Sequence, residues 1–516
     1  MKHTTDQSAF LRGSLLLTVS ALTAKICGAL FKIPLTALLG GTGMGYFSTA
    51  YGLFLPLYAV LVTGLSTAVA KPVAACIGRG DHAGALAIRR TARLLFLTTG
   101  LIGTAGAFAF AKSFTRLSAG SDAPYPAVLA IAPAVLLCSL AAVERGYWEG
   151  LCRMAPTAVS QAVEALARLL CGLFLCKRFL DAPPAFLAGC SREAAGACGA
   201  VLGVTLSALA GWLCVMLYSL SEQRPSITEK PPTRELLREL LVILIPASLG
   251  ALVTNLTTLI DLVTVMRMLQ GGDPAFLYGS FMGMAVTVFG LVPSLTNMLA
   301  KGVLPCTAQA WARSDRRAAA DYARQVLTLT GLAAIPAGCG IFVLAKPSLE
   351  FLFAGRDAEI AAASPSLQAL APGMTALCLA FPVFSLLQAV GRADLPVKLM
   401  LPGLCVKLGL NLLLVPRLGI AGAGAATSLC YLAIVIPALI ALRSILGEPL
   451  HLAKPLLSQS FAGILCAAAA WSVYGRMGLF PQRIAFLCAV GAAGIVYIAV
   501  LALLGGRKQL SPVSHG

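Results

Sequence analysis

Charged residues are scarce in this chain and make up only 12% of its 516 residues. A soluble domain carries about 25% charged residues, so the polar surface that a water-soluble protein of this length needs is missing. Hydrophobic residues make up 58% of the sequence. Apolar runs long enough to cross the hydrocarbon core of a bilayer, about 20 residues each, recur along its whole length. The composition therefore excludes a soluble protein and predicts one that crosses a membrane many times.

Residues suited to metal or catalytic chemistry are also few. The four histidines are scattered, and the 16 cysteines include no CxxC pair and no Cys/His spacing typical of a metal site. The nucleotide-binding pattern GxxxxGK[ST] does not occur, and no Ser/His/Asp or Cys/His set suggests a nucleophile. We therefore expect no enzyme, no catalytic residue, no bound metal and no cofactor. Any transport would be downhill or coupled to Na⁺ or H⁺.

The formal net charge of +18 would suggest nucleic-acid binding in a soluble chain. Here the basic residues lie mostly in short segments between apolar runs, without interleaved aromatic residues. Alternate segments hold most of the lysines and arginines, which is the bias of the positive-inside rule. It predicts a multi-pass protein of the cytoplasmic membrane with both termini in the cytoplasm, and no nucleic-acid partner.

The apolar runs predict an all-α polytopic fold with about 14 transmembrane helices. The expected spans are 11–39, 46–70, 93–111, 125–146, 156–176, 195–220, 237–266, 276–300, 325–345, 366–390, 397–416, 420–442, 455–475 and 483–505.

An internal repeat relates the two halves of the sequence. Ile131-Ala132-Pro133 recurs as Leu370-Ala371-Pro372, and the same offset maps Arg168 onto Lys407. The alternative is chance similarity between Ala/Leu-rich helices, but the coincidence of basic residues favours a repeat. Two parallel six-helix lobes that rock about a site near the membrane midplane are the physical pattern of alternating access. The predicted parts are an N-terminal lobe (1–221), a cytoplasmic linker (222–236), a C-terminal lobe (237–446) and two additional helices with a cytoplasmic tail (447–516).

Two lysines in the first expected span are candidate substrate contacts. Lys25 and Lys32 are seven residues apart, so they share one helix face about 10 Å apart along the axis. A charge at mid-bilayer costs about 2.5–3.5 kcal/mol, so its presence needs a reason. Two ammonium groups in line suit a pyrophosphate or another multiply charged anion. The alternatives are structural pairing of both lysines or a Lys32 that extends to the membrane surface.

Other polar residues within expected spans have several interpretations. Asp261 is a candidate site for the coupling ion, or else the counter-charge of a lysine in the first span; Asn255 precedes it as a candidate substrate contact. Glu164 and Arg168 are four residues apart in the order that favours a helical ion pair, so we expect a structural pair. Lys407, the repeat equivalent of Arg168, has no acid at the matching position and is a further candidate substrate contact.

Two stretches of sequence resemble the stage V sporulation protein B family. They are Lys25-Ile26-Cys27-Gly28 and the block Arg145-Gly146-Tyr147-Trp148-Glu149-Gly150 followed by Met154-Ala155-Pro156-Thr157. A third stretch, Pro416-Arg417-Leu418-Gly419, is similar to a motif that polysaccharide exporters share widely. That family belongs to the multidrug/oligosaccharidyl-lipid/polysaccharide (MOP) exporter superfamily, with the MurJ-type lipid II flippases. The resemblance implies MATE/MurJ-like lobes around a cavity that basic residues of the first helix face, and two C-terminal helices that form a groove for a lipid tail.

The leading hypothesis is a flippase of a polyprenyl-pyrophosphate-linked saccharide, such as a peptidoglycan precursor. Its partners would be that lipid-linked substrate, membrane lipids and cell-wall synthesis proteins. One alternative is a cation-coupled multidrug extruder, although the first span is cationic where such a pocket needs acids and aromatics. Another is a non-transporting scaffold for cell-wall or sporulation proteins that acts through basic loops.

Overall fold

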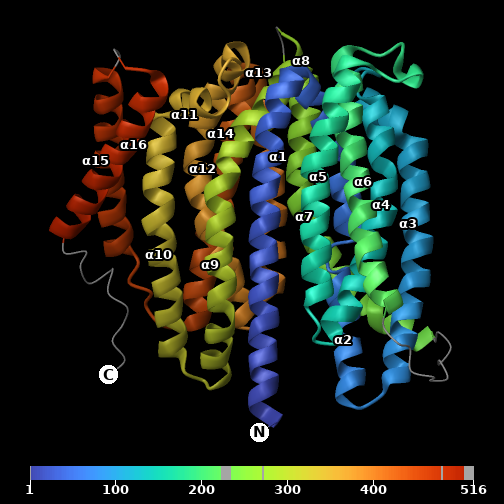
Figure 1. Ribbon diagram of the computed structural model, residues 1–516. Helices are drawn as coiled ribbons and strands as arrows, with labels where there is room; N and C mark the ends of the chain where they lie inside the picture. Colours follow the sequence, from blue (N-terminus) through green and yellow to red (C-terminus); the bar gives the residue numbers. More distant parts are fainter. Residues whose placement is uncertain (1, 222–233, 270–271, 478–479, 505–516) are drawn as a thin grey trace. The chain divides into compact units, whose positions relative to one another are not determined.

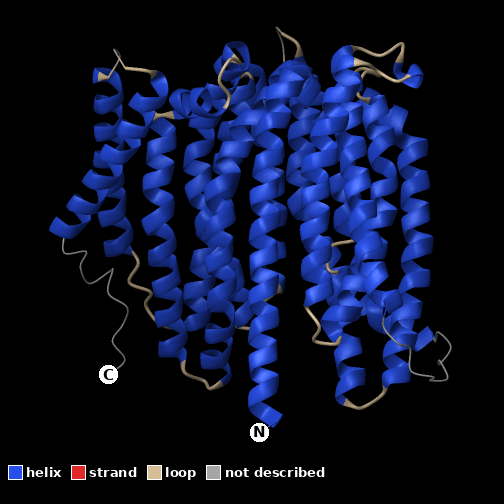
Figure 2. Ribbon diagram, in the orientation of Figure 1, coloured by secondary structure: helices blue, strands red, loops and turns tan. Residues whose placement is uncertain are grey.

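The computed structural model describes residues 2–221, 234–269, 272–477 and 480–504. These residues form helices joined by short connections, and no strand occurs among them (Figure 2). The all-α fold predicted from the apolar runs is therefore confirmed. Two compact units divide the chain, one comprising residues 1–267 and the other residues 268–516.

The first unit contains seven α-helices (Figure 1). They are α1 (Lys2–Leu61), α2 (Leu65–Gly78), α3 (His82–Ala119), α4 (Tyr125–Gly150), α5 (Ala155–Asp181), α6 (Arg192–Ser221) and α7 (Arg234–Met268), with a short 3₁₀ turn at Ala185–Leu187.

The second unit contains the remaining helices of the described residues. They are α8 (Pro274–Ser280), a π-helical turn (Phe281–Ala285), α9 (Val286–Ala312), α10 (Arg316–Val343), α11 (Ala345–Leu352), α12 (Asp357–Ala389), α13 (Asp394–Leu418), α14 (Ile420–Leu446), α15 (Ala453–Arg476) and α16 (Gln482–Leu503).

Twelve helical segments among the described residues are long and apolar enough to cross a membrane. One of them, Ile26–Gly78, covers residues 26–39 of the expected span 11–39 and all of the expected span 46–70. The expected span 237–266 corresponds to α7, which has 35 residues and is not one of the twelve. The count of twelve differs from the predicted 14 spans only in these two places. Because so many helices can cross a membrane, the protein is a multi-pass membrane protein.

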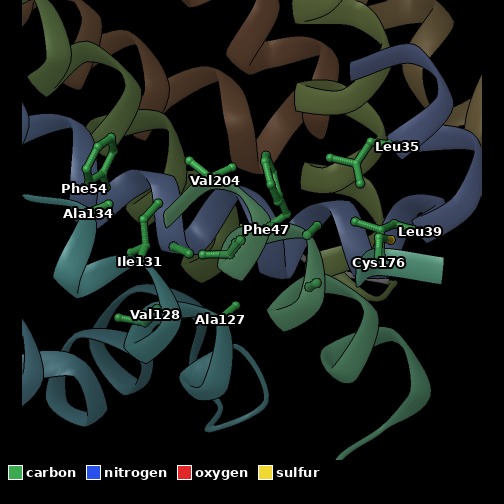
Figure 3. Packing of buried hydrophobic residues seen from close by; sticks show 14 of the residues in the cluster. Leu35, Leu39, Phe47, Phe54, Ala127, Val128, Ile131, Ala134, Cys176 and Val204 are labelled. Atoms are coloured by element: carbon green, nitrogen blue, oxygen red, sulfur yellow. The ribbon is translucent and has the colours of Figure 1, made fainter. Parts of the chain in front are cut away.

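The core of the first unit lies where α4 packs against α1 and α6 (Figure 3). Leu35 and Phe47 of α1 meet Val128 and Ile131 of α4 and Val204 of α6 in one buried cluster. Small residues of α4 and α6 allow the two helices to approach closely. In lipid there is no hydrophobic driving force between helices, so they associate through such close van der Waals packing. This cluster holds α1 beside the polar residues of α4 and α5 described below.

The outer face of α5 illustrates how the fold meets lipid. Leu166, Leu170 and Phe174 follow one another at four-residue intervals and are 48%, 66% and 68% exposed. Residues four apart lie on one face of a helix, so this face carries large apolar side chains with no protein cover. A contiguous apolar face of this kind fits a bilayer and not water.

The second unit repeats the packing of the first. In the first unit α4 contacts α3 and α6; in the second, α12 contacts α10 and α14. The matching prolines, Pro133 and Pro372, lie inside α4 and α12. The tandem repeat read from the sequence thus corresponds to equivalent helices with equivalent neighbours.

The compact units divide after α7, whereas the predicted lobes divide before it. Leu240 and Leu244 of α7 belong to a buried cluster with α2, α3 and α4. Ser248 Oγ donates hydrogen bonds to the Val60 and Thr63 carbonyls at 3.0 and 3.3 Å. These contacts bind α7 to the first unit. The lobe boundaries inferred from the sequence repeat therefore stay a prediction. Most of the predicted linker, residues 222–233, lies outside the described residues.

Two glycines interrupt the long N-terminal helical segment. At Gly40 the backbone adopts φ 65° and ψ −172°, and two helices meet there in a kink within α1. At Gly64, with φ 82°, α1 has ended and α2 begins. Positive φ favours glycine because it has no Cβ. The second break falls inside the expected span 46–70, so the prediction of one continuous helix there was wrong.

The short helix α2 lies tightly against α4 because two glycines of α4 make room for it. A Cβ on Gly146 would come within 2.6 Å of the Ser66 carbonyl oxygen, and one on Gly150 within 2.7 Å of Val73. These glycines are four residues apart, as in the small-residue interfaces of membrane helices. The Arg145-Gly146-Tyr147-Trp148-Glu149-Gly150 block therefore serves, in part, to seat α2.

We predict that Gly146→Ala lowers the free energy of unfolding by about 1–3 kcal/mol, the usual cost of overpacking, because the new Cβ meets backbone atoms of Ser66. Titration of unfolding with SDS in mixed micelles measures this change. The control is Gly106→Ala in α3, where a Cβ would meet nothing within 4 Å and alanine favours the helix. Equal stability of wild type and Gly146→Ala would contradict the tight seating of α2.

Candidate functional site

The two predicted substrate lysines lie on α1, before the kink at Gly40. The helix is continuous from Lys2 to Leu39, so the seven-residue spacing places both positions on one face. Lys32 is half-buried, and its carbonyl accepts a hydrogen bond from Thr36 Oγ1 at 2.8 Å. The Lys25 side chain lies outside the described part of the structure. Their role as substrate contacts stays a prediction.

The polar residues of α7 lie in the same unit. Asn255 is half-buried, and its amide donates to the Ala251 carbonyl of its own helix at 2.9 Å. Asp261 is 6% exposed. The next residue, Leu262, fills the space beside Gly52 of α1, where a Cβ would collide with it. Asp261 therefore lies where α7 packs closely against α1, and both of its interpretations remain open.

Lys407 belongs to the second unit and is buried there, with 2% of its surface exposed. Its Nζ donates to Thr427 Oγ1 on α14 at 2.8 Å, and that hydroxyl donates in turn to the Ala423 carbonyl. Asn411, one turn further along α13, is fully buried. The ammonium group is thus held between α13 and α14, and a substrate contact for it stays a prediction.

Glu164 and Arg168 form an ion pair, with Arg168 Nη2 to Glu164 Oε1 at 2.7 Å. A second arginine, Arg145 of α4, binds the other carboxylate oxygen at 2.9 Å. Arg145 Nε also donates to Ser160 at 2.9 Å. The sequence prediction of a self-compensated pair therefore missed a third member. The three side chains carry a net charge of +1, and their hydrogen bonds join α4 to α5.

A polar cavity of about 270 Å³ lies beside this triad, wholly within the first unit. Arg145, Glu164 and Gln161 form one side of it. The opposite side is the break between α1 and α2, with Thr63, Gly64, Ser66 and Thr67 among its residues. Irregular backbone at membrane depth is tolerated where it lines such a cavity.

Another carboxylate of α4, that of Glu144, directly precedes Arg145 in the sequence. Glu144 is 1% exposed and binds both Arg89 and Arg93 of α3. Ser219 of α6 donates to it at 3.0 Å. The Arg89 guanidinium also lies 4.3 Å from the centre of the Tyr147 ring. This cluster joins α3, α4 and α6 and again combines two arginines with one carboxylate.

Sequence reasoning missed the roles of Arg145 and Glu144 because both lie at the end of an apolar run. Charged residues at such an end are normally assigned to the loop that follows the helix. Arg89 and Arg93 were likewise assigned to a cytoplasmic segment. The available signal was the adjacent Glu144-Arg145 pair inside the continuous run 125–146, since paired opposite charges within a span usually have partners on neighbouring helices.

The second unit contains a large apolar groove of about 890 Å³ between α10, α12 and α15. Ile335, Phe342 and Pro372 line two of its sides, and Ile464 and Trp471 line the third. Gln368, Thr375 and Ser460 supply the few polar groups. A groove of this size and character accommodates an extended hydrocarbon chain.

Comparison with known proteins identifies the family. A model of the family described as lipid II flippase MurJ matches residues 81–490. The chain belongs to this family. Stage V sporulation protein B of Bacillus subtilis (strain 168) is 24% identical over an alignment of 444 residues that covers 81% of this chain and 81% of that protein. Since MurJ-family proteins are transporters, this multi-pass protein is a transporter and not an enzyme.

Solved structures show the same fold. A lipid II flippase MurJ in an inward closed conformation matches with a TM-score of 0.75 and 14% identity, covering 96% of this chain and 99% of that one. An inward-facing multidrug resistance MATE transporter of the MOP superfamily matches with a TM-score of 0.66 and 16% identity, over 81% and 95% of the two chains. The predicted MATE/MurJ-like fold is therefore confirmed.

We predict that Glu144→Gln lowers the free energy of unfolding by about 3–5 kcal/mol, because the buried guanidinium of Arg89 and the half-buried one of Arg93 lose their counter-charge. Thermal unfolding of the purified protein in detergent measures the loss. Asp122→Asn is the control: its partner Arg116 is exposed, and the guanidinium hydrogen bond that lowers the pKa of Asp122 is screened by water, so the midpoint should stay close to that of wild type. A Glu144→Gln protein as stable as wild type would contradict the pairing.

Proposed function

We propose that the protein moves a polyprenyl-pyrophosphate-linked saccharide from the cytoplasmic to the outer leaflet of the cytoplasmic membrane by alternating access. The observation that carries this proposal is the match of residues 81–490 to the lipid II flippase MurJ family. A lipid-linked substrate combines a charged head with a long apolar tail. The chain offers a cationic helix face on α1 and an apolar groove on the second unit, which suit these two parts.

The groove between α10, α12 and α15 is the proposed seat of the prenyl tail. An apolar chain gains about 25 cal/mol for each Å² of surface removed from a polar environment, but it gains nothing by leaving lipid for protein. The groove therefore guides the tail rather than providing affinity. It keeps the tail in an apolar environment while the head crosses.

The α1 face with Lys25 and Lys32 is the proposed seat of the pyrophosphate. Asn255 and Lys407 are proposed contacts for the head group, and Asp261 is the proposed site of Na⁺ or H⁺ coupling. Both termini would lie in the cytoplasm, as the distribution of basic residues suggests. Proteins of cell-wall synthesis would then supply the substrate or receive it.

Binding by the purified protein in nanodiscs tests the substrate class. The ligands compared are lipid II, an undecaprenyl-pyrophosphate oligosaccharide and a cationic dye. Saturable binding of either pyrophosphate lipid supports the proposal and distinguishes between the two saccharides. Binding of the dye alone would replace it with the multidrug extruder, and binding of none would favour the non-transporting scaffold.

We predict that the double variant Lys25→Ala, Lys32→Ala weakens binding of the pyrophosphate lipid at least tenfold. Each charge-assisted hydrogen bond to the phosphate contributes roughly 1.5–3 kcal/mol, and 1.4 kcal/mol is about a tenfold change in affinity. The matched control is Lys112→Ala with Lys346→Ala, which removes the same charge at two exposed positions. Equal weakening in both double variants would show a general effect of net charge and refute the assigned role.

We predict that Ala468→Trp slows transport of the lipid-linked substrate at least several-fold, because the indole fills the groove that the tail enters. Ala468 lines the groove and is exposed there. The control is Leu457→Trp on the same helix, at a residue that is 69% exposed and outside the groove. Transport rates in proteoliposomes measure the effect. Undiminished transport by Ala468→Trp would remove the groove from the mechanism.

A further inference from the structure

We propose that Tyr497 and Gln459 are positioning residues for the prenyl tail: they hold α15 and α16 against α10, and this fixes the width of the groove between α10, α12 and α15. The inference rests on the proposed function, in which that groove guides the tail. Neither residue is among those that line the groove. Both act through the helices that form its walls.

The proline of α10 creates the attachment point for α16. Pro336 lies inside α10, and because it has no N–H it cannot bond to the carbonyl of Leu332, four residues earlier. Tyr497 of α16 supplies the missing donor, since its hydroxyl donates to this carbonyl at 3.1 Å. Neighbouring helices satisfy in this way the backbone groups that a proline frees in a membrane helix. The bond therefore joins α16 to the turn of α10 that the proline leaves open.

Gln459 of α15 attaches to the preceding turn of α10. Its amide nitrogen donates to the Thr328 carbonyl at 3.1 Å, and the side chain is fully buried. Gly331 makes room for it, since a Cβ there would come within 2.4 Å of Gln459 Oε1. That oxygen accepts no hydrogen bond from the described residues. A polar group that is buried at such a cost inside a membrane protein indicates a function.

The surface of α15 is divided among its neighbours. Ser460, Ile464 and Trp471 line the groove, whereas a Cβ on Gly463 would come within 3.1 Å of Ile335 of α10. Alanines of α15 and α16 pack together in one buried cluster. The groove itself separates α15 from α12. The distance between these two walls therefore depends on how α15 and α16 are held on α10, beside which they lie (Figure 1).

A long tail depends on this distance more than a short one. The groove residues of α15 run from Leu456 to Trp471, about 22 Å along the helix axis. An undecaprenyl tail is longer than this and meets all three walls over their whole length, whereas a farnesyl tail is shorter. A wider groove would let the long tail escape sideways while the head crosses. Because the tail gains no affinity by leaving lipid for the groove, the loss would affect the transport rate and not binding.

Transport in proteoliposomes tests the assignment with two substrates, lipid II with its undecaprenyl tail and the same head group on a farnesyl tail. We expect the double variant Tyr497→Phe, Gln459→Met to slow the undecaprenyl substrate several-fold at unchanged binding affinity, and to leave the rate of the farnesyl substrate unchanged. The matched control is Tyr322→Phe with Gln388→Met, which makes the same changes elsewhere on α10 and α12 and should alter neither rate.

Equal slowing of both substrates by the double variant would show a general structural role and overturn the proposal, as would unchanged transport of both. Absence of transport by the wild-type protein would instead contradict the proposed function. The attachment of α16 is then decided by a measurement that needs no substrate.

That measurement is a double-mutant cycle with Pro336→Ala, read from unfolding in SDS. In the wild-type background, Tyr497→Phe leaves the Leu332 carbonyl without its donor and should lower the midpoint of unfolding. In the Pro336→Ala background, the new N–H at position 336 bonds to that carbonyl, so Tyr497→Phe should shift the midpoint much less. Equal shifts in the two backgrounds would overturn the assignment of Tyr497.

Discussion

A charge within the hydrocarbon layer is stable only when other groups of the protein compensate for it, and the first unit is organised around this requirement. Two of its carboxylates each bind two arginines: Glu144 binds Arg89 and Arg93, and Glu164 binds Arg145 and Arg168. Because Glu144 and Arg145 are adjacent on α4, this helix bonds to α3 through one residue and to α5 through the next. The electrostatic pairs thus determine which helices are neighbours as well as compensating charge.

The same helix controls the backbone on its other side. Gly146 and Gly150 let α2 approach α4, and the break at Gly64 then places the start of α2 beside Arg145. A break in a membrane helix leaves polar backbone groups that must be satisfied. Here Ser248 of α7 bonds to two of the carbonyls, while Ser66 and Thr67 of α2 line the cavity. Contacts from α2, α4 and α7 therefore stabilise the break between α1 and α2.

Much of this architecture could be predicted from the sequence, because the length and composition of an apolar run determine whether it spans a membrane. The spacing of Glu164 and Arg168 likewise predicted their ion pair, since both lie on one helix. Partners on different helices were not predictable in this way. The sequence positions of Arg145, Glu144 and Arg89 indicated the ends of loops. Only the packing of α3, α4 and α5 brings these residues to their partners. The break at Gly64 was missed because glycine is common inside transmembrane helices, so a single glycine within an apolar run does not mark the end of a helix.

Transbilayer movement of a lipid-linked substrate is the central claim, and a dithionite assay in proteoliposomes tests it most directly. Lipid II carrying a fluorophore on its head group is reconstituted with the protein, and an imposed Na⁺ or H⁺ gradient drives transport. The account predicts that the pool of the inner leaflet becomes accessible to dithionite, while phosphatidylcholine with the same fluorophore stays protected. A lipid II pool as well protected as in protein-free liposomes, under either gradient, would contradict it.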